Sequence, residues 1–322
     1  MRLSRFVRQQ DPDVSSITER EIGSKVFGSA HSLLCGFVDQ IELAIMKRSF
    51  TVYLDSSALI RACDGADEAL CAAIDFSLAD DKLIYPFSSE QIDELTSSGN
   101  TRQNASRLEY ISRISKNIYF CNSITELGFF DQTPQEVFET INEAVLAPDV
   151  QHELNDLVTH KQRLHARSAL GVCPNVLNNM NGKEAAAAIE KALSKLEPLE
   201  HSMPRSLKEI FEFSSHFVPP IPTGFAGPSK STLLFERRNQ ELLMLFSLLD
   251  TFGYWPDSER EIRRGSGFTD ARHVVNASFY HVLVSADKGL RRRAEAAYQI
   301  LGLNTHVLSV EEFVRLEVLD AS

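Results

Sequence analysis

The feature that most constrains the fold is the junction in residues 51–59 (TVYLDSSAL), where a strand-type run meets an acid. Four residues typical of a strand precede Asp55, and two serines and an apolar helix-type run follow it. We expect a strand that ends at Asp55 and turns directly into a helix. Ligand sites in open α/β sheets lie beyond the carboxyl ends of the strands, so this acid is placed for chemistry. The alternative is that Asp55 or Ser56 only caps the helix, since both residue types are favoured N-caps.

Two further junctions of strand and helix carry acids. Residues 83–87 predict a strand that leads into a helix containing Glu94, and residues 281–285 predict a strand that leads to Asp287. A fourth acid, Asp270, is expected at the start of the helix before that last strand. Strands and helices alternate in this way when helices cover both faces of a parallel sheet. The sequence therefore predicts an α/β fold with acids near the carboxyl ends of its strands.

The order of these motifs is that of one known family. The matching residues are Tyr53-Leu54-Asp55-Ser56-Ser57, Ser89 with Glu94-Leu95, Asp270 with Ala277, and Val284-Ser285-Ala286-Asp287-Lys288. With a closing segment at residues 290–313, they make the chain resemble the PIN-domain ribonucleases over roughly residues 51–121 and 231–315. The resemblance implies a three-layer PIN-like fold with a central parallel sheet.

The resemblance also implies an acidic cluster that holds Mg²⁺ or Mn²⁺, made of Asp55, Glu94, Asp270 and Asp287. Asp55 and Asp270 would be the principal ligands. Asp287 would bind a second metal or act through water, and Glu94 would complete the shell or orient the attacking water. Divalent metals activate water and stabilise charge on a transferring phosphoryl group, and Mg²⁺ prefers oxygen ligands. Glu90 shares a helix face with Glu94, so either glutamate could point at the site.

Further polar residues lie close to these acids along the chain: Ser57, Ser285, His273, Lys288 and Arg291. The two serine hydroxyls could hydrogen-bond a ligand or a carboxylate, although Ser285 could equally cap the next helix. His273 shares a helix face with Asp270 and would contact metal or substrate, the alternative being a structural histidine. Lys288 and Arg291 are candidates to contact a phosphate.

The function that these residues predict is metal-dependent hydrolysis of phosphodiester bonds, with RNA favoured over DNA by the resemblance alone. A structure-specific DNA nuclease and a catalytically silent PIN-fold binding or scaffold module are the alternatives. A phosphatase that uses Asp55 as a nucleophile is disfavoured, because Ser57 stands where a second aspartate would be expected.

The domain organisation departs from a minimal domain of this family. The predicted parts are an N-terminal helical extension (1–50), the first part of the core (51–121), a helical insertion (122–230) and the second part of the core (231–322). No convincing strand is recognised within 122–230, where helices are expected at 134–146, 148–168, 183–196 and 205–214. A long helix over 231–252 returns the chain to the core. Deletion of the insertion is expected to leave a foldable core.

Composition limits the partners and the compartment. The net charge of −11 argues against a large basic surface for nucleic acid, although metal-binding acids contribute to that charge. Five cysteines without a C-x-x-C pair favour reduced thiols, a cytoplasmic location and no zinc site. No apolar run is long enough to span a membrane. The apolar face of the N-terminal extension would pack on the core, on a protein partner or inhibitor, or on a second copy of the chain.

Overall fold

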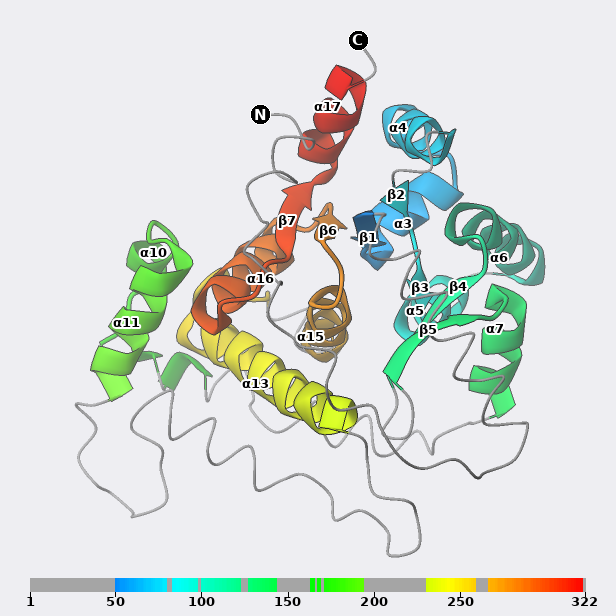
Figure 1. The fold of residues 1–322 in the computed structure, drawn as a ribbon. Helices are drawn as coiled ribbons and strands as arrows, with labels where there is room; N and C mark the ends of the chain where they lie inside the picture. Colours follow the sequence, from blue (N-terminus) through cyan, green and yellow to red (C-terminus); the bar gives the residue numbers. More distant parts are fainter. Residues whose placement is uncertain are drawn as a thin grey trace, which may run out of the picture.

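The computed structural model describes residues 50–79, 83–97, 100–122, 127–143, 163–165, 167–168, 171–193, 230–258 and 266–320 (Figure 1). Apart from Phe50, the predicted N-terminal extension lies outside the described residues, as do the helix predicted at 205–214 and most of the one at 148–168. Among the helices that are described, none combines the length and the apolar character needed to cross a bilayer.

The main sheet has four parallel strands, which confirms the predicted α/β class with a parallel sheet. In spatial order they are β2 (Leu83–Ile84), β1 (Phe50–Leu54), β6 (Val282–Ser285) and β7 (His306–Ser309). Val52 is in register with Val282, and Leu54 with Val284. Asp55 and Asp287, which follow β1 and β6, therefore lie at the same edge of the sheet.

A second sheet corrects two predictions. It consists of β3 (Phe87–Ser88), β4 (Ile118–Asn122) and β5 (Leu127–Asp131). The prediction of no strand within 122–230 is wrong, because β5 pairs antiparallel with β4. The single strand predicted over 83–87 is two short strands in different sheets, separated by Tyr85-Pro86. Proline has no backbone N–H to donate to a ladder, which accounts for the break.

Helices surround the two sheets: α3 (Ser56–Cys63), α4 (Glu68–Ala79), α5 (Ser89–Ser97), α6 (Thr101–Ser115), α7 (Pro134–Glu143), α10 (Pro174–Leu177), α11 (Gly182–Leu193), α13 (Lys230–Phe252), α15 (Ser266–Ala277), α16 (Lys288–Leu301) and α17 (Val310–Asp320). The long helix before the second part of the core is confirmed as α13. The prediction that Asp270 starts its helix is wrong, because α15 begins four residues earlier. Gly265 and Gly267 lower the helical signal of that stretch, although Gly267 is tolerated in the first turn of α15.

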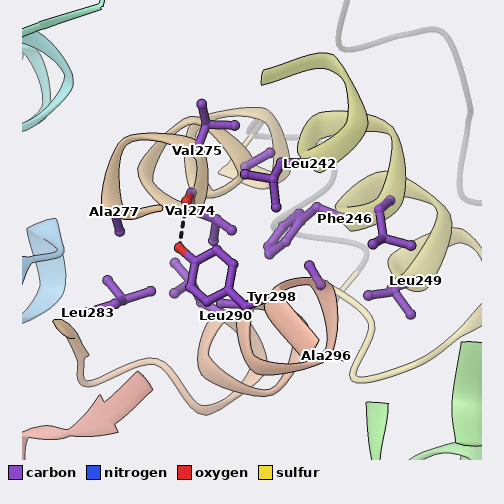
Figure 2. Close-up of a cluster of buried hydrophobic side chains, with 14 of the residues drawn as sticks. Leu242, Phe246, Leu249, Val274, Val275, Ala277, Leu283, Leu290, Ala296 and Tyr298 are labelled. Carbon is purple, nitrogen blue, oxygen red and sulfur yellow. Dashed lines mark hydrogen bonds between the residues drawn. The ribbon is translucent and has the colours of Figure 1, made fainter. Parts of the chain in front are cut away.

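The two faces of the main sheet belong to different hydrophobic cores. Tyr53 and Leu283 lie in a core built with α11, α13, α15 and α16, which Figure 2 shows in part. Their strand neighbours Leu54, Val282 and Val284 lie in the other core, with helices α3 to α7 and α17. Successive strand residues point to opposite faces, so burial of both faces explains the almost continuous apolar character of β1 and β6.

One helix from the predicted insertion is part of the first core. Ala185 and Ile189 of α11 are fully buried there. Gly182, at the start of α11, lies so close to α16 that an added Cβ would be 2.3 Å from the Cα of Ala296. Residues 122–230 therefore supply both a strand, β5, and a core helix, α11, to the body that surrounds the sheet.

Candidate functional site

Asp55 ends β1 and caps α3, so the functional and capping interpretations apply to the same residue. Its Oδ1 accepts a hydrogen bond from the backbone N–H of Ala58 at 2.8 Å. The Ser57 hydroxyl donates to the carboxylate at 2.8 Å, and the Ser285 hydroxyl donates to Oδ2 at 2.6 Å. Burial raises the pKa of Asp55, and the hydrogen bonds from Ser285, Ala58 and Ser57 oppose that rise. Both serines named from the sequence thus orient this carboxylate.

Asp287 lies beside Asp55 at the end of the neighbouring strand. It caps α16, with Oδ1 accepting from the Leu290 N–H at 2.8 Å, and its side chain is exposed. Ser285 contacts both strand ends, because its hydroxyl donates to Asp55 and accepts from the Asp287 N–H at 3.0 Å. The Ser285 hydroxyl therefore links the Asp55 carboxylate to the backbone of Asp287.

His273 occupies the centre of the site. Its ring is 2% exposed and lies between β1, α3 and α5. Nδ1 is 2.7 Å from the Tyr53 hydroxyl, while Nε2 is 3.1 Å from the Ser56 hydroxyl and 3.0 Å from Oε2 of Glu94. Burial lowers the pKa of His273, but the hydrogen bond to Glu94 and the charges of Glu94, Asp55 and Glu90 raise it overall. The ring thus lies among several carboxylates whose charges stabilise its protonated form.

Two glutamates on α5 have different environments, which separates the two candidates left open by the sequence. Glu90 is 3% exposed and accepts hydrogen bonds from Arg272 and, at 2.5 Å, from Asn276. Burial acts to raise the pKa of Glu90, but the charge of Arg272 lowers it overall. The side chain of Glu94 is 33% exposed and contacts His273 through Oε2. Glu90 is therefore a buried carboxylate paired with the partly exposed Arg272, and Glu94 is the glutamate that reaches solvent.

Asp270 lies one turn before His273, next to a buried arginine, Arg293. Arg293 is 1% exposed, with Nη2 2.5 Å from Asp257 and 3.6 Å from Asp270, and Nη1 3.6 Å from Asp250. Burial raises the pKa of Asp270 to about 7, Arg293 and His273 oppose that rise, and Asp257 and Asp287 add to it. No signal in the sequence marks Asp250 or Asp257 as neighbours of this group.

The raised pKa of Asp270 predicts a particular pH dependence of stability. Between the ordinary value of 3.8 and about 7, the folded state binds more protons at Asp270 than the unfolded state does. Stability from this residue is therefore complete below about pH 4 and falls as the pH rises to about 7. Asp270→Asn removes the ionisation, so the stability of the variant relative to the native chain should increase over that interval.

The measurement is urea unfolding of both proteins in chelator at pH 4, 5.5 and 7.5, with Asp75→Asn at an exposed position as the control for the chemical change. A stability difference between native chain and Asp270→Asn that stays constant across these pH values would contradict the prediction.

The two basic candidates are held at the same end of the sheet. The Lys288 ammonium lies over the Trp255 ring, 4.4 Å from its centroid. Nη1 of Arg291 donates to the Ser285 carbonyl at 2.7 Å. Trp255 itself has a left-handed backbone with φ of 46°, which is uncommon for an aromatic residue. Each of these cations is therefore anchored by one neighbour at the start of α16.

The predicted acids are near one another without forming a preformed metal cage. The charge of Asp287 raises the pKa of Asp270. The charge of His273 lowers the pKa values of Asp55, Glu94 and Asp270. In the part of the chain that the structure describes, no three His, Cys, Asp or Glu side chains converge closely enough to hold a metal ion. A surface groove of about 840 Å³ between α6 and the start of α7, lined by Cys63, Tyr110 and Arg113 among others, includes none of the four acids.

Comparison with known proteins adds no assignment: no family model, curated protein or solved structure matches this chain. What the structure defines is an α/β protein with a parallel four-stranded sheet and acids at the carboxyl ends of β1 and β6. The functional interpretation therefore depends on the chemistry of the residues around His273.

Proposed function

We propose that this chain is a PIN-like, metal-dependent nuclease with a three-layer fold, and that it hydrolyses phosphodiester bonds in RNA. The observation that carries the proposal is the position of His273, whose pKa is raised by Glu94 and Asp55 and which lowers that of Asp270. Asp55 after β1, Glu94 on α5 and Asp270 on α15 thus each interact electrostatically with His273, near the carboxyl edge of the sheet where α/β proteins place their ligands.

The oxygen donors of these residues are chemically suited to Mg²⁺ or Mn²⁺. Asp55, Glu94, Asp270 and Asp287 are the residues that would hold the metal. Burial raises the pKa of Asp270 to about 7 despite the charge of Arg293, so a divalent cation beside it would stabilise its ionised form. A bound divalent ion supplies an activated water and stabilises charge on the phosphoryl oxygens. Ser57 and Ser285 hold the Asp55 carboxylate in a fixed orientation.

The substrate side of the proposal uses Lys288 and Arg291. Both lie at the start of α16 next to Asp287, where a cation can contact a backbone phosphate. The net charge of −11 limits sequence-independent attraction to nucleic acid. We therefore expect a short recognition segment in single-stranded RNA, and a protein partner or a second copy of the chain would have to supply any larger basic surface.

Cleavage of labelled single-stranded RNA and DNA tests the proposal. The native chain is assayed with Mg²⁺, with Mn²⁺ and with chelator, beside Asp55→Asn, Asp270→Asn and the exposed control Asp75→Asn. We expect metal-dependent cutting of RNA, unchanged in the control and reduced at least about 100-fold in the other two variants, which corresponds to about 2.7 kcal/mol of barrier. Cutting in chelator, or full activity of Asp270→Asn, would contradict the mechanism. If the protein cuts DNA and not RNA, its substrate is DNA.

A catalytically silent binding module is the second candidate, and one observation favours it. Both oxygens of Asp55 already accept hydrogen bonds, from Ala58, Ser57 and Ser285. A folded native chain that binds RNA but cuts neither nucleic acid with either metal would select this function.

A further inference from the structure

A second role can be assigned to His273, the residue that the sequence suggested as a contact for metal or substrate. We propose that His273 is a positioning residue, which fixes the Glu94 carboxylate in its place at the site and contacts neither metal nor substrate. This inference rests on the proposed function, in which Glu94 is one of the residues that would hold the metal. The contacts that carry it are direct and belong to three different elements.

Both ring nitrogens of His273 are already engaged within the protein. Nδ1 contacts the Tyr53 hydroxyl, and Nε2 contacts Glu94 and the Ser56 hydroxyl. The ring is only 2% exposed and lies under the surface of the site. A histidine that binds a metal needs a free ring nitrogen aimed at it, and His273 has none to offer. Direct ligation is therefore disfavoured by the geometry.

The contact with Glu94 also defines the tautomer. An ionised carboxylate only accepts hydrogen bonds, so Nε2 of His273 must carry the hydrogen that Oε2 of Glu94 accepts. Tyr53 completes the arrangement from the other side, since its hydroxyl is 2.7 Å from Nδ1 and 3.1 Å from the Ser88 hydroxyl. The ring is thus fixed at both ends, and its Nε2–H has a defined direction.

Glu94 needs such a partner because its side chain is partly exposed. A free glutamate side chain samples several rotamers, and confining it costs conformational entropy. The preceding residue, Arg272, holds Glu90 in the same way one turn earlier on α5. Two consecutive residues of α15 therefore bind two glutamates spaced four apart on α5. In the first pair Glu90 is buried and Arg272 is partly exposed, whereas in the second His273 is buried and Glu94 is partly exposed.

Two conservative substitutions, His273→Gln and His273→Asn, distinguish a positioning role from a purely structural role. The amide nitrogen of Gln in His273→Gln takes roughly the place of Nε2 and can donate to Glu94. The amide of Asn in His273→Asn takes roughly the place of Nδ1 and can contact only Tyr53. We expect Mn²⁺ affinity within about twofold of native for the Gln variant and about tenfold weaker for the Asn variant, as for other partners that orient metal ligands. Equal loss in both variants would overturn the proposal.

A double-mutant cycle tests whether the effect passes through Glu94. In the Glu94→Gln background, His273→Asn should change Mn²⁺ affinity less than about twofold, because the carboxylate that it positions is gone. A full tenfold loss in that background would assign His273 to direct ligation or to general stability. Thermal unfolding of each variant confirms that only folded proteins are compared.

Metal-free crystal structures of the two variants test the positioning role of His273 independently of the proposed function. Glu94 should keep its native side-chain conformation in His273→Gln and leave it in His273→Asn. An unchanged Glu94 in His273→Asn would overturn the positioning role even if the protein is a nuclease. Conversely, if the native chain binds no Mn²⁺, the proposed function is contradicted. The two variant structures would still show whether His273 positions Glu94.

Discussion

Replacing Arg293 with alanine is expected to lower the free energy of unfolding by about 3–5 kcal/mol, the range for breaking a buried ion pair by removing one partner. Arg293 is the counter-charge for three carboxylates, those of Asp250, Asp257 and Asp270. Its guanidinium also lies over the Phe246 ring, 4.3 Å from the centroid, in the core shown in Figure 2. The substitution would therefore deprive Asp257 and Asp270 of this cation, while Arg163 still pairs with Asp250, and would open a cavity beside that ring.

The adjacent residue provides the matched control. Arg292 has a side chain that is 50% exposed and pairs with Glu295 one turn further along the same helix. Arg292→Ala should change stability by no more than about 0.5 kcal/mol, as for other exposed pairs. Urea unfolding followed by circular dichroism measures both variants. Arg293→Lys should lie between them, because lysine keeps the charge but lacks the planar fork that serves several carboxylates. Equal midpoints for the two alanine variants would refute this role of Arg293.

Deleting residues 122–230 is expected to give an unfolded or insoluble product, which reverses the expectation from the sequence. The deletion removes β5, which pairs with β4 over Leu127–Asp131, and exposes the edge of β4. It also removes α11, whose buried Ala185 and Ile189 pack in the core with α16. Loss of a strand and a core helix removes far more buried area than a domain of marginal stability tolerates.

A shorter excision controls for the loss of chain and for the new linker. Deleting residues 195–228 removes no residue of β5, α7, α10 or α11. We expect this variant to remain in solution and to unfold cooperatively, whereas the full deletion should show no cooperative thermal transition by circular dichroism. A cooperative transition in the full deletion, at a midpoint near that of the native chain, would establish 122–230 as an independent insertion after all.

What the sequence predicts well is local. The junction at Asp55 follows from residues that are adjacent in the chain, with strand formers before it and capping residues after it. The long helix α13 follows from equally local signals. By contrast, β5 exists through its antiparallel pairing with β4, and the short run around Gly128 gives no comparable signal of its own.

The choice between Glu90 and Glu94 depends on partners that no local pattern contains. Both residues share one face of α5, and what distinguishes them is Arg272, His273 and Asn276, which lie far away in the sequence. Neither a propensity scale nor a spacing rule contains that information. The position of each carboxylate relative to α15 is set by tertiary packing alone.

The run Arg291-Arg292-Arg293 illustrates the same limit. General charge patterning favours a solvated helix face for such a run, yet Arg293 is among the largest fully buried side chains described in this protein. Helical spacing offers the one available signal, since Arg293 follows Leu290 by three positions and precedes Ala297 by four, and both of those residues are in the core. A cation on the apolar face of a helix indicates buried acids, but it does not say which ones.

The parallel pairing of β1 with β6 has a consequence for the co-translational folding of this protein. Asp55 and Ser285, which meet at the end of that pair, are 230 positions apart in the chain. At about 5–20 residues per second, roughly 10–50 seconds separate the synthesis of the two strands. Throughout that interval the apolar strand β1 has emerged without its neighbour β6, so the main sheet closes only near the end of translation. Such long-range pairing slows folding and leaves an aggregation-prone edge exposed, which makes this chain a candidate to need a chaperone during its synthesis.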